Sequence, residues 1–148
     1  MIRKVIFALS FVCVLAAAGT AADKDNAAVS PSYFEGVWAG GWPNQYNPST
    51  KLNFTLTIGK RSGEGVFPVE YTWEMLQLRD RMVPGGSLKT KGRQEGDQFF
   101  LTWKNKQGDE QKITLRKESE DKVKARLDRG GILPPNAAQY FESYLTRK

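Results

Sequence analysis

Apolar and polar side chains alternate along much of the chain that follows residue 33. Within residues 51–58, every even position is apolar and every odd position is polar. Successive side chains of a β-strand point to opposite faces, so this alternation is typical of a strand with one buried face. The pattern predicts an all-β domain. Six further stretches resemble it, namely residues 34–42, 65–73, 87–93, 97–104, 111–117 and 122–128.

Short connections separate the predicted strands and indicate how they pair. Residues 59–63 and 94–97 contain glycine beside charged residues, which is typical of tight turns. Short turns make successive strands antiparallel neighbours. We therefore expect an up-and-down barrel of about seven to eight strands, because closure buries the apolar face and removes exposed edges. Closure requires an even number of strands, so either an eighth lies within residues 74–83 or the closure is imperfect. A β-sandwich is the alternative.

The pattern changes after residue 131. Two prolines and an asparagine at residues 134–136 indicate a stop followed by a helix cap. Apolar residues then recur at helical spacing, so residues 132–148 are predicted to form a short C-terminal helical tail packed on the barrel. Its aromatic stripe could instead bind a partner. The residues at helical spacing are Ala137, Tyr140, Phe141, Tyr144 and Leu145.

The first 22 residues have the pattern of a secretory signal peptide. Arg3 and Lys4 precede an uncharged run to residue 18, which is shorter than the roughly 20 apolar residues of a membrane-spanning helix. Small residues then favour cleavage after Ala21 or Ala22. A flexible leader over residues 23–32 and a barrel domain over residues 33–131 are expected to follow. The protein is predicted to be periplasmic or secreted, with no transmembrane segment after signal cleavage.

Composition narrows the possible chemistry. The formal net charge is +6, and loss of Arg3 and Lys4 would lower it by two to +4. The single cysteine, Cys13, would leave with the signal peptide. The absence of histidine excludes Ser-His-Asp triads and histidine metal sites. We therefore expect no catalytic residues, no metal and no cofactor, and we interpret the protein as a non-enzyme.

One motif resembles a known group of barrels. Gly36-Val37-Trp38 matches the G-x-W of the first strand in lipocalin-like and avidin-like (calycin-type) barrels. The length of the chain and the spacing of its predicted strands are also similar to those of these barrels. The resemblance implies an up-and-down barrel in which a basic residue from the last strand covers the first-strand tryptophan, and Arg126 or Lys124 is expected in that role. Independently, tryptophan is large enough to plug a barrel end, so a structural role is expected for Trp38.

Aromatic residues at inward or rim positions suggest a ligand site. A small barrel with such a lining either fills itself or leaves a cavity for one apolar or ring-containing ligand. Two loops, residues 43–50 and 75–84, could shape its entrance. The candidate ligand-binding residues are Trp42, Tyr46, Tyr71, Trp73, Phe99 and Trp103.

Basic residues suggest a second hypothesis. Lys89, Lys91 and Arg93 alternate along one predicted strand, and further basic residues lie along two others, namely Lys112, Arg116, Lys122, Lys124 and Arg126. If these faces adjoin, they would form a positive surface for an anionic polysaccharide, a lipid headgroup or an acidic protein. Nucleic acid is not an expected partner of an exported protein. A third possibility is a structural or inhibitory role in the cell envelope.

Overall fold

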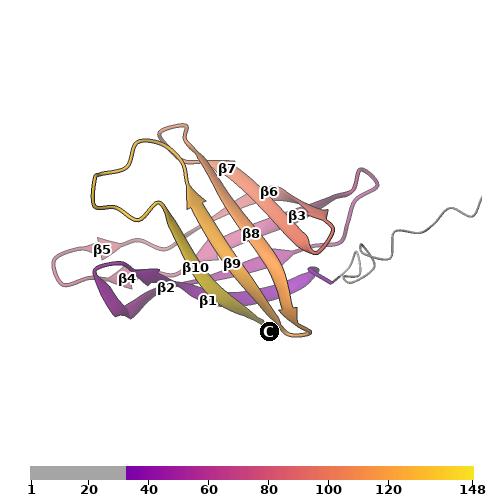
Figure 1. Cartoon of the computed structure of the whole chain (residues 1–148), viewed down its shortest axis with the longest axis horizontal. Coiled ribbons are helices and arrows are strands. Elements are labelled where there is room, and N and C mark those ends of the chain that lie inside the picture. Colours follow the sequence, from indigo (N-terminus) through magenta and orange to yellow (C-terminus); the bar gives the residue numbers. More distant parts are fainter. Residues whose placement is uncertain (1–32) are drawn as a thin grey trace, which may run out of the picture.

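A closed antiparallel β-barrel forms the body of the protein (Figure 1). The computed structural model describes residues 33–148, so the predicted signal peptide and leader lie outside the described residues. Each strand pairs with its sequence neighbour in the barrel, and the last pairs with the first. The strands are β1 (Gly36–Asn44), β2 (Asn47–Ile58), β3 (Val66–Trp73), β6 (Gly86–Glu95), β7 (Gln98–Lys104), β8 (Glu110–Ser119), β9 (Lys122–Arg129) and β10 (Tyr140–Arg147).

This arrangement confirms the predicted all-β, up-and-down barrel, and the sandwich alternative is wrong. Eight strands close the ring in the order β1-β10-β9-β8-β7-β6-β3-β2. Every adjacent pair is antiparallel, as short turns between alternating strands require. Within residues 33–148 the structure contains no helix that could cross a membrane.

The predicted C-terminal helix is wrong, because Tyr140–Arg147 forms strand β10. Phe141 and Leu145 are four residues apart, a spacing that suits a helix. Side chains an even number of residues apart also share one face of a strand. The two side chains therefore lie on the same face of a strand. Leu145 is fully buried, whereas Tyr140 and Tyr144 are exposed on the opposite face. As a strand, the segment also supplies hydrogen-bond partners to β1 and β9, which a helix would leave unpaired.

The eighth barrel strand is thus β10, and the expectation of an eighth strand in residues 74–83 is wrong. That connection forms a separate two-stranded hairpin from β4 (Leu76–Gln77) and β5 (Met82–Val83). The hairpin lies outside the closed ring, beside the β1–β2 turn (Figure 1). The barrel therefore extends beyond the predicted boundary at residue 131 to residue 147.

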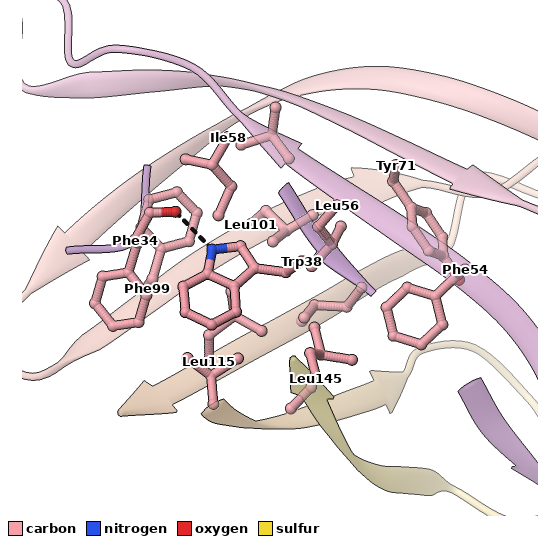
Figure 2. Close-up of a cluster of buried hydrophobic side chains, with 14 of the residues drawn as sticks. Phe34, Trp38, Phe54, Leu56, Ile58, Tyr71, Phe99, Leu101, Leu115 and Leu145 are labelled. Carbon is pink, nitrogen blue, oxygen red and sulfur yellow. Dashed lines mark hydrogen bonds between the residues drawn. The ribbon is translucent and has the colours of Figure 1, made fainter. Parts of the chain in front are cut away.

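The core fills the barrel around Trp38, as Figure 2 shows. Trp38 is completely buried, and its indole Nε1 donates a hydrogen bond to the Phe34 carbonyl oxygen at 2.8 Å. Phe34 and Phe99 lie on one side of the indole, whereas Phe54 and Tyr71 lie on the other. The structural role expected for Trp38 therefore agrees with its surroundings.

Arg147 closes the end of the barrel at which the described chain begins. Its guanidinium lies 4.2 Å from the Trp38 ring centre. Its Nη1 donates to the Glu35 carbonyl oxygen at 2.7 Å, and its Nη2 donates to the Tyr33 carbonyl oxygen at 2.7 Å. A basic residue of the last strand does cover Trp38, but it is Arg147. The expectation of Arg126 or Lys124 was wrong because it took β9 for the last strand.

Candidate functional site

A pocket of about 440 Å³ lies at the opposite end of the barrel from Arg147. Four connections meet at this end: the β1–β2 turn, residues 74–85, residues 105–109 and residues 130–139. Three of them contribute to the pocket, and its walls are mainly apolar. The lining residues are Trp42, Pro43, Asn44, Gln45, Tyr46, Leu52, Tyr71, Leu76, Leu78, Arg81, Gln111, Leu127, Arg129, Pro134, Ala137 and Phe141.

The deepest part of the lining is an aromatic pair. Trp42 and Tyr71 are only 4% and 6% exposed, so they form the base of the pocket. The Trp42 indole stacks on the Phe54 ring, with centres 4.4 Å apart and an angle of 14° between the planes. Its Nε1 donates a hydrogen bond to the Tyr71 hydroxyl at 2.9 Å. Stacking and hydrogen bonding thus hold both rings in place, as expected of a preformed site.

Burial controls the ionisation of the Tyr71 hydroxyl. Desolvation raises the pKa of Tyr71 to about 12, and the hydrogen bond from Trp42 lowers it only in part. The phenol is therefore neutral at physiological pH and retains its proton. Because its oxygen already accepts a bond from Trp42, the hydroxyl proton is available for donation.

The rim of the pocket comes from the loops that the sequence indicated as an entrance. Leu76, Leu78 and Arg81 come from the β4–β5 hairpin region, and Tyr46 lies in the β1–β2 turn. Gln45 connects this turn to the β9–β10 connection: its Nε2 donates to the Asn136 carbonyl at 2.8 Å, and its Oε1 accepts from the Ala138 amide at 2.6 Å. Two connections that are about 90 residues apart are thereby held together.

Two polar side chains contribute to the pocket from adjacent strands. Gln111 of β8 is paired with Arg129 of β9 in the strand ladder. The Gln111 amide donates to backbone carbonyls of Asp109 and Glu110. The Arg129 Nη1 donates to the Ala138 carbonyl at 3.0 Å, and the guanidinium lies 5.7 Å from the Phe141 ring centre. Arg129 is thus positioned by the β9–β10 connection.

The sequence candidates for ligand binding fall into three groups. Trp42, Tyr46 and Tyr71 line the pocket. Trp73 and Trp103 do not line it, but their rings lie 5.3 and 5.5 Å from Tyr71 and support its position. Phe99 belongs to the other end of the barrel, where it contacts Phe34 and Phe67.

Sequence reasoning missed Gln111, Arg129 and Phe141. The first two continue the inward phase of their strands, since Gln111 is two residues before Ile113 and Arg129 two residues after Leu127. A polar residue at an inward position near a strand end was the available signal. Phe141 was assigned to the wrong element, the predicted helix.

The basic candidates lie on three strands of the barrel, β6, β8 and β9. Lys89, Lys91 and Arg93 point outward from β6, and no ion pair involves them within residues 33–148. Lys124 pairs with Glu142 at 3.3 Å, and Arg126 pairs with Asp128 at 2.8 Å. Strands β7 and β8 separate β6 from β9. The condition that the basic strands adjoin is therefore met for β8 and β9 but not for β6.

A larger depression, about 650 Å³, lies on the outer wall over β1, β2 and β10. Polar side chains such as Lys51, Asn53 and Glu142 line much of it. Ligand sites are usually concave, mostly apolar and only sparsely polar, a description that fits the barrel mouth better. Within the described residues, no group of acidic or cysteine side chains is arranged to hold a metal ion.

Comparisons with known proteins bear on the fold alone. A redesigned β-barrel matches with a TM-score of 0.55 and 14% identity, covering 80% of this chain and 94% of that chain. A mutant of the fluorescent protein UnaG matches with a TM-score of 0.48 and 12% identity, covering 80% of this chain and 99% of that chain. No protein-family model and no curated protein matches the chain. The eight-stranded antiparallel ring, together with the likeness to the redesigned barrel, supports a calycin-like fold.

Proposed function

We propose that this protein is a non-enzymatic binding protein that takes up one small apolar or ring-containing molecule at the open end of its barrel. The supporting observation is the contrast between the two barrel ends. One end is closed by Arg147 over Trp38, whereas the other carries the pocket of about 440 Å³ with Trp42 and Tyr71 at its base. Burial of apolar ligand surface against such rings contributes about 25 cal/mol per Å².

The environmental dye N-phenyl-1-naphthylamine, a neutral molecule with three aromatic rings, provides a direct test. Its fluorescence should rise on titration with the protein and saturate at one molecule per chain. Substitution Ala137→Trp should weaken binding at least tenfold, because Ala137 lines the pocket and its connection can hold a larger side chain without disturbing the core. Absence of saturable binding by the unmodified protein would contradict the proposal.

The matched control is Thr72→Trp, which adds the same side chain to the exposed outer face of β3. This variant should bind the dye as tightly as the unmodified protein. If both tryptophan variants weakened binding equally, the dye would not be reporting on the barrel mouth. Raising the salt concentration should leave affinity for this uncharged probe nearly unchanged.

A second candidate function is binding of an anionic partner through β6. It is favoured by the exposure of Lys89, Lys91 and Arg93, none of which forms an ion pair within residues 33–148. Retention on immobilised heparin measures this interaction. Neutralising all three residues to glutamine should lower the eluting salt concentration if β6 binds polyanions, whereas equal elution would exclude it.

Export is the remaining part of the proposal. The charged start, the apolar run and the small residues before Asp23 support a periplasmic or secreted location. We propose that the barrel functions there after removal of residues 1–22.

A further inference from the structure

The pocket at the barrel mouth offers positive charge and hydrogen-bond donors without a matching acid. Arg81 and Arg129 both line it, and none of the described lining residues is an aspartate or glutamate. Within residues 33–148, neither arginine forms an ion pair with any carboxylate. The nearest acid along β9, Asp128, is bound to Arg126 on the outer wall. An apolar pocket with two uncompensated guanidinium groups is electrostatically suited to an anion.

Arg129 is the better placed of the two arginines. It is only partly exposed, and its Nη1 is fixed by the Ala138 carbonyl at 3.0 Å. A guanidinium carries five N–H donors, so most of them remain available to a ligand. The group is also oriented over the Phe141 ring at 5.7 Å. A positioned arginine loses little conformational entropy when it binds an oxyanion.

The Tyr71 hydroxyl adds a neutral donor to the same pocket. Its oxygen accepts from Trp42 at 2.9 Å, and within the described chain its proton has no acceptor. Side-chain neighbours connect Tyr71 to Arg129 around the barrel mouth. The Tyr71 and Trp103 rings are 5.5 Å apart, Trp103 pairs with Gln111, and Gln111 pairs with Arg129. The donors thus belong to one level of the barrel.

We infer that the ligand is an apolar molecule carrying a single acidic group of the carboxylate or sulfonate type. The apolar body lies against Trp42, Leu127 and Phe141, and the acidic group is bound by Arg129, with Tyr71 donating a hydrogen bond. Arg81 contributes positive charge from the β4–β5 hairpin. This inference rests on the proposed function, because it names the ligand class of the same pocket.

Two dyes that share one apolar body test the acidic group separately from the pocket. N-phenyl-1-naphthylamine is neutral, and 1-anilinonaphthalene-8-sulfonate is the same molecule with a sulfonate. The unmodified protein should bind the sulfonate at least tenfold more tightly than the neutral dye, since a hydrogen bond to a charged group contributes that much or more. Higher salt should reduce this preference and leave the neutral dye unaffected.

Charge-removing variants locate the acid-binding group. Arg129→Gln should weaken sulfonate binding about tenfold or more while the affinity for the neutral dye stays within about twofold. Arg129→Lys, which retains the charge, should recover part of the loss. Arg81→Gln, at an exposed position, should weaken sulfonate binding by a smaller factor and gives a second readout if the Arg129 variants do not fold. The control Arg61→Gln removes an exposed charge from the connection between β2 and β3 and should change neither affinity.

The outcomes separate the two proposals. If the neutral dye binds but the sulfonate gives no advantage, or if neither Arg129→Gln nor Arg81→Gln affects the sulfonate, the acidic-ligand inference is overturned and the proposed function stands. If Arg61→Gln weakens sulfonate binding as much as Arg129→Gln, the sulfonate does not bind at the barrel mouth and the inference is again overturned. If neither dye binds saturably, both proposals fail.

Discussion

Replacement of Arg147 by methionine tests whether one side chain holds the closed end of the barrel together. Arg147 is the last residue of β10, and it fastens the segment before β1 through carbonyl oxygens of Tyr33 and Glu35, both at 2.7 Å. It also covers Trp38 at 4.2 Å. Methionine preserves apolar contact with the indole but donates no hydrogen bond. The substitution therefore removes the bonds and the charge while leaving most of the volume.

The expected loss follows from these contacts. A hydrogen bond from a charged donor contributes about 1.5–3 kcal/mol, and a cation over an aromatic ring contributes about 0.5–2 kcal/mol. The Arg147 side chain is 30% exposed, so water compensates for part of what is lost. Its 3.7 Å contact with Asp121 adds little, because that carboxylate is exposed. We expect the free energy of unfolding to fall by about 2–4 kcal/mol.

Urea denaturation followed by tryptophan fluorescence measures this change. Arg147→Lys should recover less than half of the loss, because a single ammonium does not reproduce the planar pair of donors with which the guanidinium binds two carbonyl oxygens. Arg93→Met on the outer wall is the control and should change stability by no more than about 0.5 kcal/mol. A loss below about 0.5 kcal/mol for Arg147→Met would refute the role assigned to Arg147.

Three further predictions follow from particular residues. Gly92→Ala should lower stability by about 1–3 kcal/mol in thermal unfolding, because a Cβ there would overlap the ring of Phe99; an unchanged melting temperature would contradict this packing. Burial raises the pKa of Tyr71 above its ordinary value of 10 to about 12. The folded state therefore favours the neutral phenol, and this preference should add about 2–3 kcal/mol to the free energy of unfolding below pH 10 and be lost as the pH rises to 12. Tyr71→Phe should remove that part of the pH dependence of urea unfolding. Mass spectrometry of protein expressed in a bacterium and recovered from the periplasm should show loss of residues 1–21 or 1–22, whereas an intact N-terminus would contradict the signal peptide.

The error over β10 shows a limit of periodicity as evidence. Phe141 and Leu145 are four residues apart, which agrees with both a helix and a strand. The prolines and glycines before them suggested a helix boundary, but residues 130–139 are a long connection that spans the mouth of the barrel. Residues 140–147 form a strand because β1 and β9 would otherwise each have an unpaired edge, and β10 pairs with both.

The candidate site was anticipated in part. Trp42 and Tyr71 were expected at inward or rim positions, and both lie at the base of the pocket. Phe99 shares that inward phase but lies at the closed end, since β7 begins there. Phase along a strand tells which face a side chain occupies, not which end of the barrel it reaches.

Local alternation was enough to establish most strands and their buried faces, because the period of two depends only on neighbouring residues. The identity of the closing strand, the residue over Trp38 and the composition of the open mouth depended on contacts between distant segments. Arg147 meets Glu35 across 112 positions, and Gln45 meets Asn136 across 91. Such pairings form only when the edge strands satisfy each other's backbone hydrogen bonds, a condition imposed by the closed ring and not by any local pattern.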